Sequence, residues 1–267
     1  MTRITAGGTA YEIQGRGPAV VLVNGMGLNK AMWQWLVPAL TPRFQVVTYD
    51  LLGHGESADP AGRPELRSFS AQMIELLDCC GLVRAAVAGF SLGGMIARRF
   101  AIDHPDRLSA LAVLHSAHDR GAEQRAAIGR RLDTARQAGP AATVDAALAR
   151  WFTDDFRTRQ PEIMDLVRRW MTANRKEVYA AIYRVLAEDD AEIAGPIAEI
   201  RCPTLVMTGD RDVGNSPDMA RRMGSAIPGA RVAILPGLCH MALAEDPAAF
   251  NAPLISFLTE PLVARPD

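Results

Sequence analysis

The sequence predicts an α/β fold in which a mostly parallel, doubly wound sheet carries an inserted helical cap. Short, continuous apolar segments alternate with segments of helical periodicity along much of the 267-residue chain. Continuous apolar segments, unlike alternating ones, are typical of strands in a parallel sheet that is buried on both faces. The alternation stops between His118 and Pro196, where only helix-forming stretches occur. We therefore expect residues 118–196 to form a cap, and residues 1–117 and 197–267 to form the core domain.

The expected strands are runs rich in Val, Leu, Ile and Ala, which fit a pleated and buried surface. They span residues 19–23, 46–49, 85–88, 111–114, 204–207 and 231–235. At the start of the chain, residues 4–14 are expected to form an antiparallel hairpin at one edge of the sheet.

The expected helices of the core domain lie between these strands. In the first of them, apolar residues recur at helical spacing after Ser70, which is a candidate N-cap. The core helices are expected over residues 70–80, 95–103 and 217–226, and the cap helices over residues 125–137, 142–152, 161–174 and 175–187.

The composition is that of an ordinary soluble protein, with 49% hydrophobic and 22% charged residues. A net charge of -1 provides no strong attraction to nucleic acid or to an anionic membrane. Because no segment resembles a signal peptide or approaches the roughly 20 apolar residues of a membrane helix, we expect a cytoplasmic location. Free thiols rather than a metal site are expected for the cysteines Cys79, Cys80, Cys202 and Cys239.

The clearest chemical signal is the G-x-S-x-G motif of residues 89–93, which has Ser91 at its centre. It directly follows an expected strand and precedes an expected helix. A serine on such a sharp turn exposes its Oγ, and the small residues on either side relieve the crowding. The N-terminus of the helix is then directed at negative charge that develops on a substrate. We predict that Ser91 is a nucleophile.

A serine nucleophile needs a base, and histidine is the usual one. The chain order Ser, acid, His is typical of this strand-turn-helix arrangement, and His240 is late enough in the chain to satisfy it. His54 is expected to shape a turn near the site, and His104 to end a helix. The two others, His115 and His118, follow a strand end near the cap, where they could contact substrate.

The base in turn needs a carboxylate that orients it. Asp210 and Asp212 both follow the strand expected at residues 204–207. The later residue is better placed to reach the histidine, so Asp212 is the predicted acid and Asp210 a turn residue. Asp119, just past the preceding strand, is a minor rival.

The oxyanion that forms on an attacked carbonyl needs N–H donors. One is expected from the backbone of Leu92, the residue after the nucleophile, and the other from Met26 in a glycine-rich loop. Trp33 is expected in the pocket wall, and Trp151 of the cap is the aromatic residue expected to face the substrate. His115 completes the predicted substrate-binding set.

Over essentially its full length the sequence resembles the α/β-hydrolase superfamily, and more narrowly the 3-oxoadipate enol-lactonases and related carboxylesterases. Residues 50–57 (Asp-Leu-Leu-Gly-His-Gly-Glu-Ser) resemble the family's D-x-R-G-x-G-x-S turn. Residues 24–27 (Asn-Gly-Met-Gly) resemble the N-S-L-G loop of the lactonases, and residues 149–156 resemble their cap. Leu52 stands where the family turn usually carries arginine, which weakens the expectation of an anionic substrate.

These observations and the resemblance together imply a serine hydrolase that cleaves a carboxylic ester or a lactone of a small molecule through an acyl-enzyme. No cofactor, metal, nucleic acid or membrane is expected as a partner, and a homodimer is compatible with the sequence. The alternatives are a C–C hydrolase of ring-cleavage products, a perhydrolase or haloperoxidase, and a receptor that retains the triad without turnover.

Overall fold

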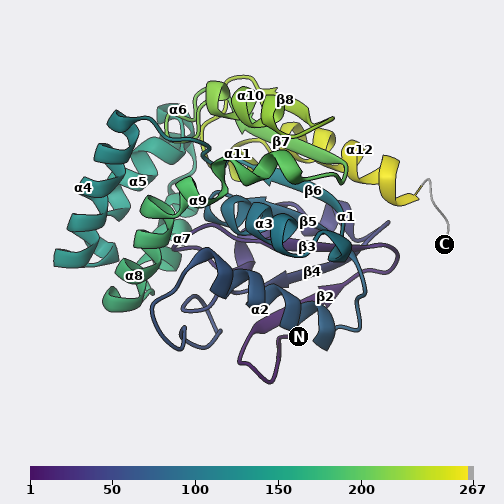
Figure 1. The fold of residues 1–267 in the computed structure, drawn as a ribbon. Helices are drawn as coiled ribbons and strands as arrows, with labels where there is room; N and C mark the ends of the chain where they lie inside the picture. The colour runs from purple at the N-terminus through teal and green to yellow at the C-terminus, as the bar shows by residue number, and fades with distance from the viewer. Residues whose placement is uncertain (264–267) are drawn as a thin grey trace.

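The computed structural model describes residues 1–263, and its centre is an eight-stranded sheet with helices on both faces (Figure 1). The strands follow the order β1-β2-β4-β3-β5-β6-β7-β8. Strands β3 to β8 are parallel, whereas β1 pairs with β2 and β2 pairs with β4 in antiparallel fashion. The predicted parallel sheet and its edge hairpin are thus confirmed. The strands are β1 (Arg3–Ile4), β2 (Ala10–Gln14), β3 (Ala19–Val23), β4 (Gln45–Tyr49), β5 (Ala85–Phe90), β6 (Leu108–Leu114), β7 (Thr204–Gly209) and β8 (Arg231–Leu235).

Successive residues of the central strands contribute to two hydrophobic cores, one on each face of the sheet. In β5, for example, Val87 packs into the core that contains α2 (Leu66–Cys79) and α3 (Leu92–Asp103). Ala86 and Ala88 pack into the core that contains α11 (Ala242–Glu245) and α12 (Pro247–Val263). Every residue of β5 and of β7 is buried. The continuous apolar strands of the sequence therefore reflect a sheet that is covered on both faces.

The helices of the core domain lie between the strands, as expected, apart from the last two, which follow β8. They are η1 (Lys30–Trp35), α1 (Val37–Leu40), α2 (Leu66–Cys79), α3 (Leu92–Asp103), η2 (Pro105–Arg107), η4 (Pro196–Glu199), α10 (Pro217–Ala226), α11 (Ala242–Glu245) and α12 (Pro247–Val263). The expected N-cap of α2 is wrong, because the helix begins four residues earlier and Ser70 is buried within it. Glu65 is the N-cap, and its N–H donates to Ser68 Oγ at 3.2 Å.

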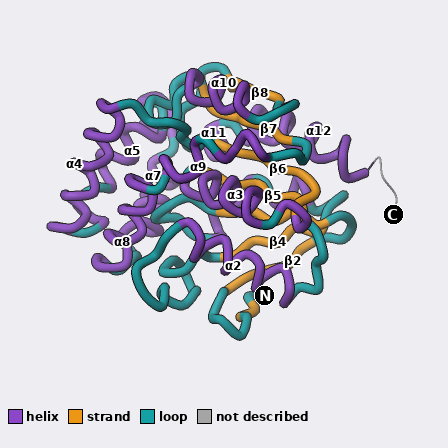
Figure 2. The backbone as a smooth tube through the Cα atoms, in the orientation of Figure 1, coloured by secondary structure: helices purple, strands orange, loops and turns teal. Residues whose placement is uncertain are grey.

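Between β6 and β7 the described chain contains helices and no strand. All of them except η4 lie together to one side of the sheet (Figures 1 and 2). They are α4 (Ala122–Ala138), η3 (Pro140–Ala142), α5 (Val144–Trp151), α6 (Asp154–Arg159), α7 (Pro161–Thr172), α8 (Lys176–Glu188) and α9 (Asp190–Ala194). We refer to residues 118–196 as the cap segment.

Asp189, between α8 and α9, joins the cap segment to the core domain. Its Oδ2 accepts a hydrogen bond from Leu66 N at 3.3 Å, and Arg184 Nη1 lies 3.4 Å from its Oδ1. Arg184 also donates to the carbonyl of Pro64. Asp189 is only 4% exposed, and this burial raises the pKa of its carboxyl to about 6.

A substitution of Asp189 by Asn is expected to stabilise the protein above pH 6. The folded-state pKa of about 6 lies above the unfolded value of about 3.9. The folded protein therefore loses stability as the pH rises from the unfolded pKa through the folded pKa. An amide oxygen keeps the acceptor for Leu66 N without the buried charge, although the contact of Oδ1 with Arg184 is lost, so Asp189→Asn should be about 1 kcal/mol more stable at pH 7.5. Denaturant unfolding at pH 7.5 and pH 4 measures this, and an equal advantage at both values would contradict the argument.

Candidate active site

Ser91 lies at the sharp turn between β5 and α3, with φ 56° and ψ -114°. Non-glycine residues seldom adopt this backbone conformation, and such strain is often found at functional sites. The turn is held by Ser91 N, which donates to Leu114 O at 2.9 Å. A Cβ at Gly89 would lie 2.1 Å from Gly93 O, and a Cβ at Gly93 would lie 2.2 Å from Val23 O. Both glycines of the motif are therefore required for the turn to form.

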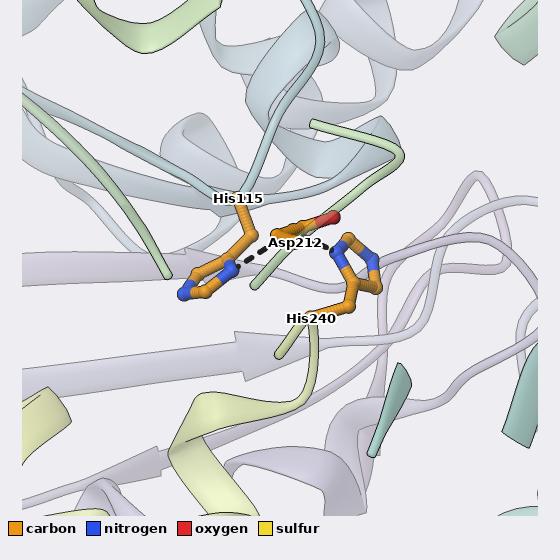
Figure 3. A group of neighbouring side chains, drawn as sticks. All are labelled: His115, Asp212 and His240. Atoms are coloured by element: carbon orange, nitrogen blue, oxygen red, sulfur yellow. Dashed lines mark hydrogen bonds and ion pairs between the residues drawn. The ribbon is translucent and has the colours of Figure 1, made fainter. Parts of the chain in front are cut away.

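Asp212 and His240 form a buried hydrogen-bonded pair, in which His240 Nδ1 lies 2.7 Å from Asp212 Oδ2 (Figure 3). Asp212 follows β7 and His240 follows β8. The other carboxylate oxygen, Oδ1, accepts backbone hydrogen bonds from Gly214 at 3.1 Å and from Asn215 at 3.0 Å. Burial alone would raise the pKa of Asp212, but the charge of His240 and the hydrogen bonds to the carboxylate hold it below its ordinary value. The carboxylate is ionised and can orient the imidazole.

The two rival acids lie elsewhere. Asp210 is exposed, and its Oδ1 accepts a hydrogen bond from Gly237 N at 2.7 Å, so it is a turn residue. Asp119 is exposed. Its backbone carbonyl, not its carboxylate, accepts a hydrogen bond from Arg222 Nη2 at 3.2 Å.

Ser91, Asp212 and His240 line a single cavity between the core domain and the cap segment. Within residues 1–263, no hydrogen bond joins Ser91 to His240; such bonds often tighten only when substrate is present. The indole of Trp151 lies over the imidazole of His240, with ring centroids 5.6 Å apart. The cavity therefore has a serine and a histidine–carboxylate pair in its wall.

The loop that follows β3 packs directly against the serine. A Cβ at Gly25 would lie 3.3 Å from Ser91 Cβ, and Met26 lines the cavity. Leu92 is the first residue of α3, so its N–H has no acceptor within the helix. Among the described residues, neither Met26 N nor Leu92 N donates to a protein acceptor. Both N–H groups are thus without a protein acceptor in the described part of the chain.

Side chains from two other segments hold this loop in place. Gly27 N donates to His54 Nε2 at 2.9 Å, and His54 Nδ1 donates to Leu52 O at 3.2 Å. Burial lowers the pKa of His54 to about 4, so it stays neutral and can accept at Nε2. The expectation that His54 shapes a turn near the site is confirmed. From the cap segment, Asn174 Nδ2 donates to Gly27 O at 3.0 Å.

Two of the predicted substrate-contacting residues are not on the cavity wall. Trp33 is fully buried because η1 packs it onto the sheet, where its ring lies edge-on to Phe90 at 6.4 Å. His115 is also fully buried, because the chain turns after β6 and places its ring behind Asp212, at 3.1 Å from the carboxylate. The expectation of substrate contact does not fit either position. Trp151 does line the cavity.

The sequence reasoning missed three arginines in the cavity wall, Arg120, Arg131 and Arg150. Arg120 lies at the start of the cap segment and is 5% exposed. The others belong to α4 and α5, where each lies close in sequence to buried apolar residues such as Leu132 and Leu148. The signal that the sequence offers for Arg131 and Arg150 is an arginine next to the apolar positions of an expected helix.

A strained serine between a strand and a helix, followed in the chain by an aspartate and a histidine that pair, is the arrangement of an α/β hydrolase. In agreement, a family profile described as "alpha/beta hydrolase fold" matches residues 18–247. The chain belongs to this family and is a hydrolase. No helix within residues 1–263 has the length and apolar character needed to cross a membrane.

Among its relatives is a 3-oxoadipate enol-lactonase of Acinetobacter baylyi, which is 29% identical over 88% of this chain and 86% of the relative. An (E)-2-((N-methylformamido)methylene)succinate hydrolase from the same organism is 26% identical over 93% of each chain. The crystal structure of an enol-lactonase from Burkholderia xenovorans superposes with a TM-score of 0.90 at 31% identity, covering 97% of this chain and 100% of that one. The chain therefore resembles enol-lactonases over nearly its whole length.

Proposed function

We propose that the protein is a serine hydrolase that cleaves a carboxylic ester or lactone of a small molecule through an acyl-enzyme. The observation that carries the proposal is the 2.7 Å contact between Asp212 and His240 in the wall of the cavity that also contains the strained Ser91. A cavity with a nucleophile, an oriented base and free N–H donors has the parts that acyl transfer needs.

In the proposed reaction, Ser91 Oγ attacks the carbonyl carbon while His240 Nε2 takes the hydroxyl proton. The N–H groups of Met26 and Leu92 stabilise the oxyanion. His240 then gives the proton to the leaving oxygen, and afterwards activates the water that hydrolyses the acyl-enzyme. Asp212 stabilises the imidazolium throughout, and no cofactor enters these steps.

The cap segment is proposed as a lid that excludes water from this chemistry. It is attached beside the base, because Met241 N donates to Trp151 O at 2.9 Å. The carboxylate of Glu245 also bridges the two parts, accepting from Thr153 N at 2.6 Å and from Cys239 N at 2.9 Å. These bonds hold Trp151 beside His240.

The charge of the cavity supports a substrate that carries a carboxylate. Among residues 1–263, neither Arg131 nor Arg150 forms an ion pair or a hydrogen bond through its side chain, and Arg131 Nε is buried without a partner. Burial lowers the pKa of Arg150, and the nearby charge of Arg131 lowers it further. In the described part of the wall the one carboxylate is Asp212, which is already bonded to His240. An anionic substrate would compensate these like charges.

The names of two relatives agree with this substrate class, since 3-oxoadipate and succinate are both carboxylates. Because Leu52 replaces the arginine of the family turn, the sequence weakened the expectation of an anionic substrate. In the structure, the arginines of the cavity wall come from the cap segment instead. The proposed substrate is therefore an ester or lactone whose acyl or alcohol part ends in a carboxylate.

A substitution of Arg131 by Gln should raise KM about tenfold for an ester that ends in a free carboxylate, because a charge-assisted hydrogen bond is lost. The increase should be much smaller for the methyl ester of the same compound. Steady-state kinetics on such matched pairs, with aryl esters and lactones of graded length, provides the measurement. The neighbouring Arg130 is exposed on the same helix, and Arg130→Gln is the charge-matched control. Equal changes for both substrates would count against the anionic class.

A further inference from the structure

His115 is a buried histidine that the proposed mechanism does not use. It directly follows β6, and its Nδ1 lies 3.1 Å from Asp212 Oδ2 (Figure 3). His240 Nδ1 contacts the same oxygen at 2.7 Å. One of these imidazoles precedes Asp212 in the chain and the other follows it. Both contact the same carboxylate oxygen.

The position of His115 is energetically unfavourable for a side chain that serves only for packing. Its backbone has φ 48°, in the left-handed region that non-glycine residues seldom adopt. Its Nε2 is buried and has no hydrogen-bond partner in the described part of the chain. The ring lies between aromatic neighbours, with centroids 5.7 Å from Phe90 and 6.0 Å from Phe250. A phenyl ring would fill such a site without leaving a polar atom unpaired.

The contact with Asp212 fixes the protonation of His115. Burial lowers the pKa of His115, so the ring is neutral and carries one proton. Only Nδ1 faces an acceptor, so the proton is assigned there. The charged or titratable groups that act on this ring are Asp212, His240 and, at longer range, Glu245. His115 is therefore a neutral N–H donor aimed at the carboxylate.

We propose that His115 is a positioning residue for Asp212, holding its carboxylate in the plane that faces His240. This inference rests on the proposed role of Asp212 and His240. Backbone N–H groups of Gly214 and Asn215 hold Oδ1, and the two imidazoles hold Oδ2. The side-chain amide of Asn215 makes longer contacts, at 3.3 Å with Oδ1 and 3.4 Å with Oδ2. With donors on both oxygens the carboxylate cannot rotate about its Cβ–Cγ bond without breaking several hydrogen bonds.

A second effect follows from the shared oxygen. Each N–H donor disperses part of the negative charge of the carboxylate, so less of it remains to stabilise the imidazolium of His240. Loss of the His115 donor should leave more charge on Asp212. The acid limb of the kcat/KM profile should then move to higher pH, by a few tenths of a pH unit.

Two substitutions of His115 separate positioning from packing. An asparagine side chain at this position would place an amide N–H donor where Nδ1 stands and tolerates a positive φ, but it gives up the ring. Hence His115→Asn should retain kcat within about threefold, whereas His115→Phe, which keeps the ring and lacks the donor, should lose about tenfold or more. The acid limb should shift in His115→Phe and return toward the wild-type position in His115→Asn. His115→Leu is a second variant without the donor, should the phenyl ring prevent folding.

The opposite pattern, with full activity in His115→Phe and a loss in His115→Asn, would show a packing role and overturn the proposal. Equal losses without a shift of the acid limb would overturn it as well. Asp212→Asn, measured beside these variants, separates this proposal from the proposed function. If Asp212→Asn is inactive while His115→Phe is active, the inference on His115 alone fails; if Asp212→Asn is active, the proposed function fails.

Discussion

Replacement of Ser91 by Ala is expected to lower kcat by about 10⁴-fold or more on every accepted ester or lactone. The side chain removed is the one that forms the covalent bond with the acyl group, and nothing else on the cavity wall replaces it. Thr143, Tyr179 and Tyr183 also carry hydroxyl groups and line the cavity, but they belong to the cap segment, away from the turn at the N-terminus of α3. Water attack assisted by the oxyanion donors is the one route that remains.

The measurement is steady-state hydrolysis together with labelling by an aryl phosphonate, which reacts with an activated serine. Wild-type protein should gain the mass of one phosphonyl group, and Ser91→Ala should gain none. Ser225 is exposed on α10, so Ser225→Ala is the matched control and should keep both activity and labelling. Retention of wild-type turnover by Ser91→Ala would exclude Ser91 as the nucleophile, whatever the fold.

The prediction of Ser91 from the sequence succeeded in placing it on the turn because the signals there are local. A buried strand, two glycines and a helix start are all encoded within a few residues, and each has a steric reason. The strand at Arg231–Leu235 was likewise predicted at its observed bounds, because it is bounded by residues that break strands. Local patterns thus determined the order of elements and the turn.

The errors at the candidate site concern contacts between segments that are distant in the chain, unlike the local error at the N-cap of α2. Trp33 and His115 were expected at the cavity because each follows a segment near the site, but the direction of a side chain depends on packing against other elements. His115 has a φ of 48°, and its ring faces Asp212. Nothing in the sequence indicates this backbone conformation. The arginines of the cap were missed for a related reason, since a cavity between helices becomes visible only when their faces are assembled.

Replacement of Asp212 by Asn is expected to lower kcat by about 10³–10⁴-fold. Both oxygens of this carboxylate accept from donors: Oδ1 from the backbone of Gly214 and Asn215, Oδ2 from His240 and His115, and both, at longer distance, from the side chain of Asn215. An amide has one oxygen and one NH₂ group, so either orientation sets a donor against donors. If the NH₂ group faces His240, the imidazole must adopt the other tautomer and cannot accept the serine proton; if it faces the backbone, the loop is disturbed and the imidazolium loses its counter-charge.

Asp210 provides a matched comparison two residues away. Its carboxylate is exposed and accepts from Gly237 N, a bond that an amide oxygen can also accept. Asp210→Asn should therefore keep kcat within about twofold, since exposed substitutions of this kind have small effects. Steady-state kinetics across pH 5–9 compares the two variants, and circular dichroism verifies that both fold. A larger loss at position 210 than at position 212 would assign the acid to Asp210, and the pairing of His240 with Asp212 would then have no catalytic meaning.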